Sequence, residues 1–312
     1  MQLCGVRLRG PVLNGSGTFD AIAAHRVFGD ALMDGFPFDA FVSKTITLAP
    51  RQGNPPPRLW ESPSGLINSI GLPNKGLKGF LAEDLPKLRK LPVPLIVSVM
   101  GFSRDELAML VKTVGSRSEV AMIELNFSCP NVETGTVMGA DPVETAAAVE
   151  RLRPLTATPL IVKLTPNATD PSAVAAAAEE AGADAVSLIN TLRGMALDPR
   201  TRQPWLGGGT GGVSGPAVRP IALAQVADVA RRVSIPVVGM GGIASGRDAR
   251  DFLDAGASAI AVGTESFRDP AAGGRIAREL AELSPPAVNT AETGEAAPAS
   301  TPGGRSQGTL AR

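Results

Sequence analysis

The stretch VVGMGGIASGRDARDFLDAGASAIAVGTESF, residues 237–267, contains two short apolar runs that each end in a glycine turn, with a helical segment between them. The apolar runs, 237–242 and 259–264, have the length of buried strands. The segment between them follows Ser245, a residue type that caps helix N-termini. Strand, helix and strand in this order predict a parallel βα unit.

The same unit recurs along the chain. Ser103, Asp141 and Asp170 are further N-cap candidates before helical segments. Eight such units within roughly 270 residues match the size of a TIM (β/α)8 barrel, and we expect that fold. The other predicted strands are 11–16, 40–45, 95–100, 121–126, 160–165 and 185–190, and the predicted helices are 105–114, 142–152, 171–183, 217–233 and 246–257.

A doubly wound open sheet is the competing architecture. It usually carries GxGxxG after its first strand, whereas this chain has GSGTFD at 15–20, without a third glycine in register. The glycine-rich turns come late instead, as GMGGI (239–243) and VGTESF (262–267). Barrels commonly bind a phosphate after their seventh and eighth strands, so these turns predict a phosphorylated ligand.

Composition excludes several classes of function. The chain has 312 residues, 44% of them hydrophobic, and a formal net charge of zero, which argues against a nucleic-acid-binding surface. Its two cysteines and single histidine, His25, cannot form a disulfide framework or a multi-histidine metal centre. We therefore expect no structural or catalytic metal.

The two ends of the chain also carry information. The N-terminus lacks the pattern of an export signal and no apolar run is long enough to span a membrane, so we expect a cytoplasmic protein. From Ser284 onward Pro, Ala, Thr, Gly and Ser dominate, and Val288 and Leu310 are the only large apolar residues. We predict a barrel domain at 1–283 and a disordered tail at 284–312.

The segment ELNFSCPN (124–131) places Cys129 on the loop that leaves the apolar run VAMIEL (120–125). Loops at the carboxyl ends of parallel strands carry active sites in α/β folds. Most free cysteines are small buried residues, but Pro130 and the flanking amides make this loop a poor place to bury a thiol. Cys129 is therefore our catalytic candidate, and Cys4 is expected to be structural.

Polar residues stand at the ends of the predicted strands. Lysines within apolar strands, as in FVSKT and IVKLT, are costly to bury unless an anion or hydrogen-bonded partner compensates them. Together with amides and phosphate-binding turns they favour flavin mononucleotide (FMN), whose ring needs a cation or donor near N1. We assign that role to Lys163, and Lys44 could serve both the ring and a substrate carboxylate. The polar strand-end residues are Ser16, Lys44, Ser98, Asn126, Lys163 and Asn190.

With these residues assembled, the chain resembles the dihydroorotate dehydrogenases of class 1, most closely the class 1B catalytic subunit. The resemblance covers about residues 1 to 283. It rests on SKTIT (43–47), RQGNPPPR (51–58), NSIGLPN (68–74), ELNFSCPN, VKLTPN (162–167), INTLRGMALDPRTRQP (189–204), GGVSGPA (211–217), GMGGI and AVGT (261–264).

The resemblance implies oxidation of (S)-dihydroorotate to orotate in pyrimidine (UMP) biosynthesis. Cys129 would remove the C5 proton while a hydride moves from C6 to flavin N5, and the segment 131–140 would close over the site. FMN would be bound by Ser16, Gly17, Lys44, Thr45, Ser98, Asn126, Lys163, Ile189, Gly215, Gly241, Gly242, Gly263 and Thr264. Orotate would be held by Lys44, Asn68, Ser69, Ile70, Gly71, Leu72, Asn126, Asn131, Asn190 and Thr191.

The resemblance leaves the electron acceptor open between two classes. Class 1B passes electrons to NAD through a separate iron–sulfur and FAD subunit in a heterotetramer, whereas class 1A is a homodimer that uses fumarate. INTLRGMALDPRTRQP and TGTVMGADP (134–142) favour 1B, although Ser98 stands where that pattern usually has asparagine. Class 2 fits less well, because it uses a serine base and a membrane-associated N-terminal extension.

Two further classes of function differ in what they require. A flavin barrel that reduces uridine in transfer RNA needs a basic surface, and this chain is neutral without a Lys/Arg run. A phosphate-binding barrel without catalytic activity would lack flavin absorbance even after FMN is added.

Overall fold

The computed structural model describes residues 1–127 and 138–283. Eight parallel strands form one sheet in the order β3, β14, β13, β10, β9, β8, β7, β4, and each lies within a predicted strand or one residue beyond it. Their bounds are β3 (Val12–Asn14), β4 (Phe41–Val42), β7 (Leu95–Val99), β8 (Val120–Asn126), β9 (Leu160–Lys163), β10 (Ala185–Leu188), β13 (Val237–Met240) and β14 (Ala259–Val262).

The two ends of this sheet meet, so it closes into a cylinder. Leu13 of β3 and Ala40, just before β4, form a parallel bridge. The Asp39 N–H donates to the Val12 carbonyl at 2.7 Å across the same seam. The predicted TIM (β/α)8 barrel is confirmed.

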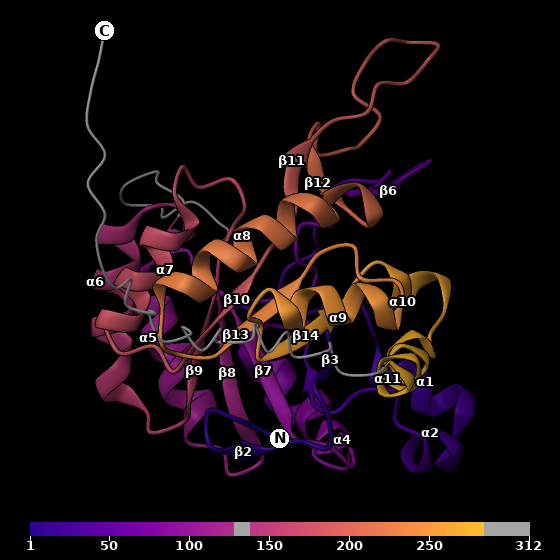
Figure 1. Ribbon diagram of the computed structural model, residues 1–312. Coiled ribbons are helices and arrows are strands. Elements are labelled where there is room, and N and C mark those ends of the chain that lie inside the picture. Colours follow the sequence, from indigo (N-terminus) through magenta and orange to yellow (C-terminus); the bar gives the residue numbers. More distant parts are fainter. Residues whose placement is uncertain (128–137, 284–312) are drawn as a thin grey trace, which may run out of the picture.

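Helices surround the cylinder (Figure 1). Ser103, Asp141, Asp170 and Ser245 each accept a hydrogen bond from an N–H of the following first turn, as predicted for N-caps. The longer helices are α1 (Ala21–Phe28), α5 (Arg104–Gly115), α6 (Pro142–Leu152), α7 (Pro171–Glu180), α8 (Arg219–Arg232), α9 (Gly246–Asp254) and α11 (Ala272–Glu282). Shorter turns are α2 (Asp30–Asp34), α3 (Gly76–Gly79), the π-helix η1 (Phe80–Asp84), α4 (Leu85–Leu88) and α10 (Glu265–Arg268).

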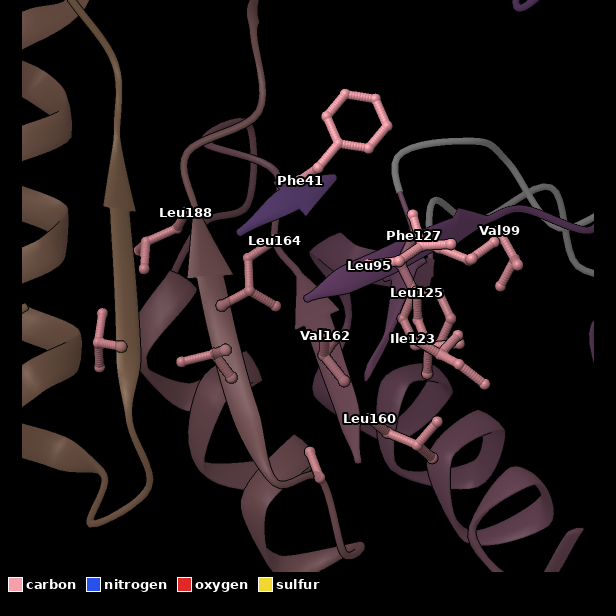
Figure 2. Packing of buried hydrophobic residues seen from close by; sticks show 14 of the residues in the cluster. Phe41, Leu95, Val99, Ile123, Leu125, Phe127, Leu160, Val162, Leu164 and Leu188 are labelled. Carbon is pink, nitrogen blue, oxygen red and sulfur yellow. The ribbon is translucent and has the colours of Figure 1, made fainter. Parts of the chain in front are cut away.

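The apolar core has two layers because alternate strand residues face opposite sides of the sheet. The outer layer fills the space between strands and helices, and Figure 2 shows part of it around Ile123, Leu125 and Val162. The inner layer fills the lower barrel with residues such as Ile96, Met122 and Ile161. Its other members are Leu3, Leu8, Leu13, Ala40, Val42, Ala185, Val238, Met240, Ala259 and Ala261.

The same alternation decides what lies above the inner layer. Two residues further along their strands than Ile96, Met122, Ile161 and Ala185 come Ser98, Glu124, Lys163 and Ser187, all of them buried. The lower barrel is closed by Leu3 and Leu8 around the hairpin of β1 (Gln2–Leu3) and β2 (Val6–Arg7). The barrel interior is therefore apolar at the amino ends of the strands and polar at their carboxyl ends.

A second, antiparallel sheet was not predicted. Its order is β11, β12, β6, β5. In Figure 1 the strands labelled β11, β12 and β6 lie together above the barrel. This sheet joins two insertions far apart in sequence, since Gly212 pairs with Asn68. Glycine-rich strands lack the apolar alternation that marks a strand. The bounds are β5 (Leu59–Ser62), β6 (Gly65–Asn68), β11 (Leu192–Gly194) and β12 (Gly211–Ser214).

Two negative findings apply to residues 1–127 and 138–283. No helix there is long and apolar enough to cross a bilayer. Nor does that part of the chain contain a cluster of three or more His, Cys, Asp or Glu side chains arranged to hold a metal ion. The tail predicted at 284–312 lies outside the described residues.

Candidate active site

A cavity of about 430 Å³ lies at the carboxyl ends of the barrel strands. The segments that follow β3, β4, β10, β13 and β14 line it, together with the last residues of β8 and β9. The antiparallel sheet completes its wall through β5, β6 and β12. This is the edge of the barrel at which the sequence predicted a site.

Most of the predicted site residues line this one cavity. Three do not: Ser98 lies deeper in the barrel, and Ser69 and Gly71 are not on the cavity wall. Cys129 and Asn131 lie outside the described residues. The predicted residues on the wall are Ser16, Gly17, Lys44, Thr45, Asn68, Ile70, Leu72, Asn126, Lys163, Ile189, Asn190, Thr191, Gly215, Gly241, Gly242, Gly263 and Thr264.

Other wall residues were missed by the sequence reasoning. Leu59 and Phe267 are large apolar side chains that line the cavity although each is more than half exposed. Ser214 accepts a hydrogen bond from the hydroxyl of Thr264 at 2.9 Å. Leu59 and Ser214 belong to the unpredicted sheet, so no strand-end pattern pointed to them.

Lys163 has an acidic partner inside the barrel. Its Nζ lies 3.6 Å from Oε1 of Glu124, and the two side chains are 7% and 4% exposed. The Ser98 hydroxyl donates to Oε1 at 3.0 Å and the Ser187 hydroxyl to Oε2 at 3.4 Å. Glu124 was not among the predicted residues, although the cost of burying a charge in an apolar strand applied to it as it did to the lysines.

Hydroxyls and amides from several strand ends form one hydrogen-bonded network above this pair. Thr45 Oγ1 lies 3.0 Å from Ser16 Oγ and 2.9 Å from Ser98 Oγ. Asn126 donates to Thr45 Oγ1 at 3.2 Å and accepts from Asn190 at 3.3 Å. Such connected polar groups fix one another's orientation, so the cavity wall is organised before a ligand arrives.

The described part of the cavity wall is cationic. Its two charged side chains are Lys44 and Lys163. Water reaches Lys44 through the open cavity, but the protein around it still desolvates its ammonium and lowers its pKa, an effect that Asp20 opposes and Arg58 reinforces. This wall is suited to an anionic ligand.

The glycine turns bring backbone groups to the cavity. Gly242 has φ of 74°, and a Cβ there would lie 2.7 Å from the Gly215 carbonyl oxygen, so a side chain is excluded by the backbone. At Gly263 a Cβ would meet only Thr18 Cγ2 within 4 Å, at 3.8 Å. The space beside Gly263 therefore belongs to the cavity, and a ligand phosphate can approach the backbone there.

A larger hollow of about 960 Å³ adjoins this cavity and shares Gly17 and Lys44 with it. Its wall includes Phe19 beside α1 and Phe80 of η1. Apart from Gly17 and Lys44, it contains none of the residues predicted to contact the flavin or the substrate. We therefore place the chemistry in the smaller cavity.

Cys4 has the surroundings of a structural thiol. Burial, with a smaller effect of Asp184, raises its pKa to about 12. Its Sγ donates to the Asp184 carbonyl oxygen at 3.4 Å. Cys4 is thus a neutral thiol at physiological pH.

The segment predicted to close over the site, 131–140, lies only partly within the described residues. Its last three residues form a 3-10 helix, η2 (Met138–Ala140), in which Met138 is 1% exposed. The Gly139 N–H donates to the Phe127 carbonyl at 2.9 Å. Met138 and Gly139 are therefore buried against the core, whereas Ala140 is half-buried.

Fold and cavity together define a (β/α)8 barrel with a cationic, glycine-lined mouth. The sequence profile of the family described as "Dihydroorotate dehydrogenase" matches residues 1–283. The chain therefore belongs to the dihydroorotate dehydrogenases, a family of flavin-dependent oxidoreductases, and falls in its class 1 branch.

Named relatives of both class 1 types are similar over most of the chain. "Dihydroorotate dehydrogenase B (NAD(+)), catalytic subunit" of Pelobacter propionicus is 47% identical over 281 residues, which cover 90% of this chain and 91% of the relative. The protein of the same name from Citrifermentans bemidjiense is 45% identical over 281 residues, with the same coverage. "Putative dihydroorotate dehydrogenase A (fumarate)" of Solibacter usitatus is 46% identical over 282 residues, covering 90% and 91%.

Proposed function

We propose that this chain oxidises (S)-dihydroorotate to orotate with FMN, as the catalytic step of pyrimidine (UMP) biosynthesis. The observation that carries the proposal is the cavity at the strand ends, which brings together two lysines, strand-end amides and the glycine turns. The family match over residues 1–283 supports the same reaction.

The donor set of the cavity fits FMN. The turns at Gly215, Gly241, Gly242 and Gly263 line the cavity, where their backbone groups would bind a phosphate, and Lys163 would supply a cation for the ring near N1. Ser16, Thr45 and Asn126 would add hydrogen bonds from the network already described. Bound FMN would accept the hydride that leaves C6 of the substrate.

Lys44 would hold the substrate carboxylate. It lines the cavity in which Asn68, Asn190 and Thr191 also lie, and these side chains would orient the pyrimidine ring. An ammonium pairs well with a carboxylate in a site that is partly shielded from water.

Cys129 would be the base. Asn126, the last residue of β8, lines the cavity, and Cys129 follows it by three residues, a separation that the peptide chain can span over at most about 11 Å. Its thiolate would take the proton from C5 as the hydride leaves C6, so that the C5–C6 double bond of orotate forms.

We further propose that electrons pass to NAD⁺ through a separate iron–sulfur and FAD subunit, in a heterotetramer. The relatives from Pelobacter propionicus and Citrifermentans bemidjiense carry names of this NAD⁺ type. Fumarate reduction by a homodimer is the second candidate, because the relative from Solibacter usitatus carries the fumarate name.

The first test is purification followed by absorbance spectroscopy and a turnover assay. We expect yellow protein with one FMN per chain that bleaches on addition of dihydroorotate without oxygen. Protein that takes up no FMN, or whose flavin dihydroorotate cannot reduce, would refute the proposal.

The base is tested by Cys129→Ser, with Cys4→Ser as the matched control. We expect the Cys129 variant to keep its FMN and to lose flavin reduction by orders of magnitude at neutral pH, because a serine hydroxyl is a far weaker base. Cys4→Ser should keep the rate. A normal rate in Cys129→Ser would remove that residue from the mechanism.

The electron acceptor is tested by assaying the isolated chain and the chain copurified from its own cells. NAD⁺ reduction that requires a copurified iron–sulfur flavoprotein supports the first assignment. Fumarate turnover by the isolated chain would replace it with the second.

A further inference from the structure

Glu124 is a buried acid to which the proposed reaction assigns no task. It lies on β8 between Met122 and Asn126, which share its inward direction, and it is 3% exposed. Met122 belongs to the apolar layer below and Asn126 to the cavity wall above. A carboxylate at this depth costs several kcal/mol to desolvate unless partners compensate it.

Three strands supply those partners. Glu124 Oε1 accepts a hydrogen bond from the Ser98 hydroxyl of β7 at 3.0 Å and lies 3.6 Å from Lys163 Nζ of β9. Glu124 Oε2 accepts a hydrogen bond from the Ser187 hydroxyl of β10 at 3.4 Å. Both oxygens are engaged, so the carboxylate is fixed beneath the cavity floor.

Within residues 1–127 and 138–283, Glu124 is the acidic partner of Lys163. A separation of 3.6 Å is an ion pair rather than a close hydrogen bond, and an ammonium has three donors. Lys163 also lines the cavity, so its remaining donors can serve a ligand there. The ion pair thus places the Lys163 ammonium at the ligand, with the Glu124 carboxylate on the side away from the cavity.

We propose that Glu124 is the positioning residue for Lys163, holding its ammonium directed toward the N1 edge of the bound flavin. This inference rests on the flavin site proposed above. Glu124 itself touches neither the cavity nor the reacting atoms; it acts through Lys163.

The charges around Lys163 explain why an anion is required. Glu124 faces it from β8 and the uncharged Ser187 from β10, while Lys44 is the other cation on the described cavity wall. Burying an ammonium is costly, and a nearby carboxylate offsets that cost. Without Glu124, Lys163 would lose the anion that compensates its burial.

The test is a double-mutant cycle with Glu124→Gln, Lys163→Met and the double variant, each purified as the FMN-bound protein. FMN affinity and the midpoint potential of the flavin are measured from pH 6 to 9.5. We expect Glu124→Gln to bind FMN about 10-fold more weakly, because the variant loses the charge-assisted contact between Glu124 and Lys163. The midpoint potential of its flavin should also shift, because the Lys163 ammonium is no longer held at the flavin edge where reduction develops negative charge.

In the Lys163→Met background Glu124→Gln should change neither quantity further. Glu124→Asp keeps the charge and should restore the wild-type midpoint potential even if FMN affinity stays reduced, which loss of packing alone would not do. Equal effects of Glu124→Gln in both backgrounds, or a Glu124→Gln midpoint potential equal to that of the wild type, would overturn the proposal.

If Glu124→Gln does not fold, the double variant removes both buried charges at once and can be compared with Lys163→Met. Equal potentials in these two proteins support the proposal, and different potentials overturn it. If the purified wild-type protein binds no flavin, the proposed function itself is refuted. If it binds flavin but the effects of Glu124→Gln and Lys163→Met are additive, only the role of Glu124 is refuted.

Discussion

Asn14 and Val42 exchange two hydrogen bonds across the seam of the barrel. The Asn14 side-chain amide donates to the Val42 carbonyl at 2.8 Å, and the Val42 N–H donates to Asn14 Oδ1 at 2.8 Å. Asn14 is fully buried at the end of β3, and Val42 ends β4. One side chain therefore substitutes for the backbone pairing that two short strands cannot complete.

Replacing this asparagine tests the seam. Asn14→Ala would leave the buried Val42 N–H and carbonyl without their partner, and each unsatisfied group costs about 1–3 kcal/mol. We expect the free energy of unfolding, measured with urea, to fall by roughly 2–5 kcal/mol. Asp170→Ala removes an exposed N-cap and should lower the free energy of unfolding by less. An Asn14 variant no less stable than the Asp170 variant would show that the seam does not depend on this side chain.

Two glycine substitutions separate cavity space from packed core. Gly263→Ala adds a methyl group toward the cavity, where only Thr18 lies within 4 Å. We expect normal thermal stability and weaker FMN binding. Gly239→Ala would place a Cβ 2.7 Å from the Phe252 ring, an overpacked contact that costs about 1–3 kcal/mol. Calorimetry measures the stability of the two variants and titration measures their FMN affinity. An unchanged FMN affinity in Gly263→Ala would show that the FMN phosphate does not bind at that turn.

Lys44→Met tests the carboxylate contact. We expect orotate to bind about 10- to 100-fold more weakly, since a hydrogen bond to a charged group contributes about 1.5–3 kcal/mol. Because burial lowers the Lys44 pKa below 10.5, wild-type orotate affinity should fall as pH rises through that lowered value, where the ammonium loses its proton. Lys75→Met, which removes an ion pair with Glu83 and Asp84 beside the larger hollow, is the control. Equal orotate affinities in the two variants would refute the assignment.

Cys4 should resist alkylation. With a pKa of about 12, its thiolate fraction at pH 8 is roughly three orders of magnitude below that of a free cysteine. Peptide mass spectrometry after iodoacetamide treatment should find Cys4 unmodified in folded protein and modified in urea. Fast labelling of the folded protein would contradict the burial seen here.

The same shift has a consequence for stability. Folding raises the Cys4 pKa from 9.0 to about 12, so the folded state favours the neutral thiol. This contribution is complete below pH 9 and is lost as pH rises from 9 to 12. Cys4→Ala should therefore flatten the decline in stability over that range.

Much of the fold was predictable because its information is local. Apolar runs of strand length, alternating with capped helices, gave the eight barrel strands and the N-caps at Ser103, Asp141, Asp170 and Ser245. The strand-end polar residues followed, because parallel strands in a barrel deliver their carboxyl ends to one edge. Lys44, Asn126, Lys163 and Asn190 line one cavity as a result.

Other features arise from contacts between residues distant in sequence. Gly212 pairs with Asn68, and this pairing holds the antiparallel sheet together at the cavity wall. No local sequence pattern encodes the pairing. Asn14 closes the seam because Val42, 28 residues away, presents two backbone groups to it. Ser98 was expected at the flavin, yet it lies below the cavity on Glu124.

The sequence by itself determined the barrel and the chemical character of its mouth, because strand length, alternation and capping are properties of neighbouring residues. Tertiary structure alone decided which buried charges face each other. Glu124 and Lys163 are 39 residues apart in the chain and on adjacent strands, and their Oε1 and Nζ atoms come to 3.6 Å only because parallel register aligns Asn126 with Lys163. Burial then makes that pairing obligatory, since neither charge is stable alone in the barrel.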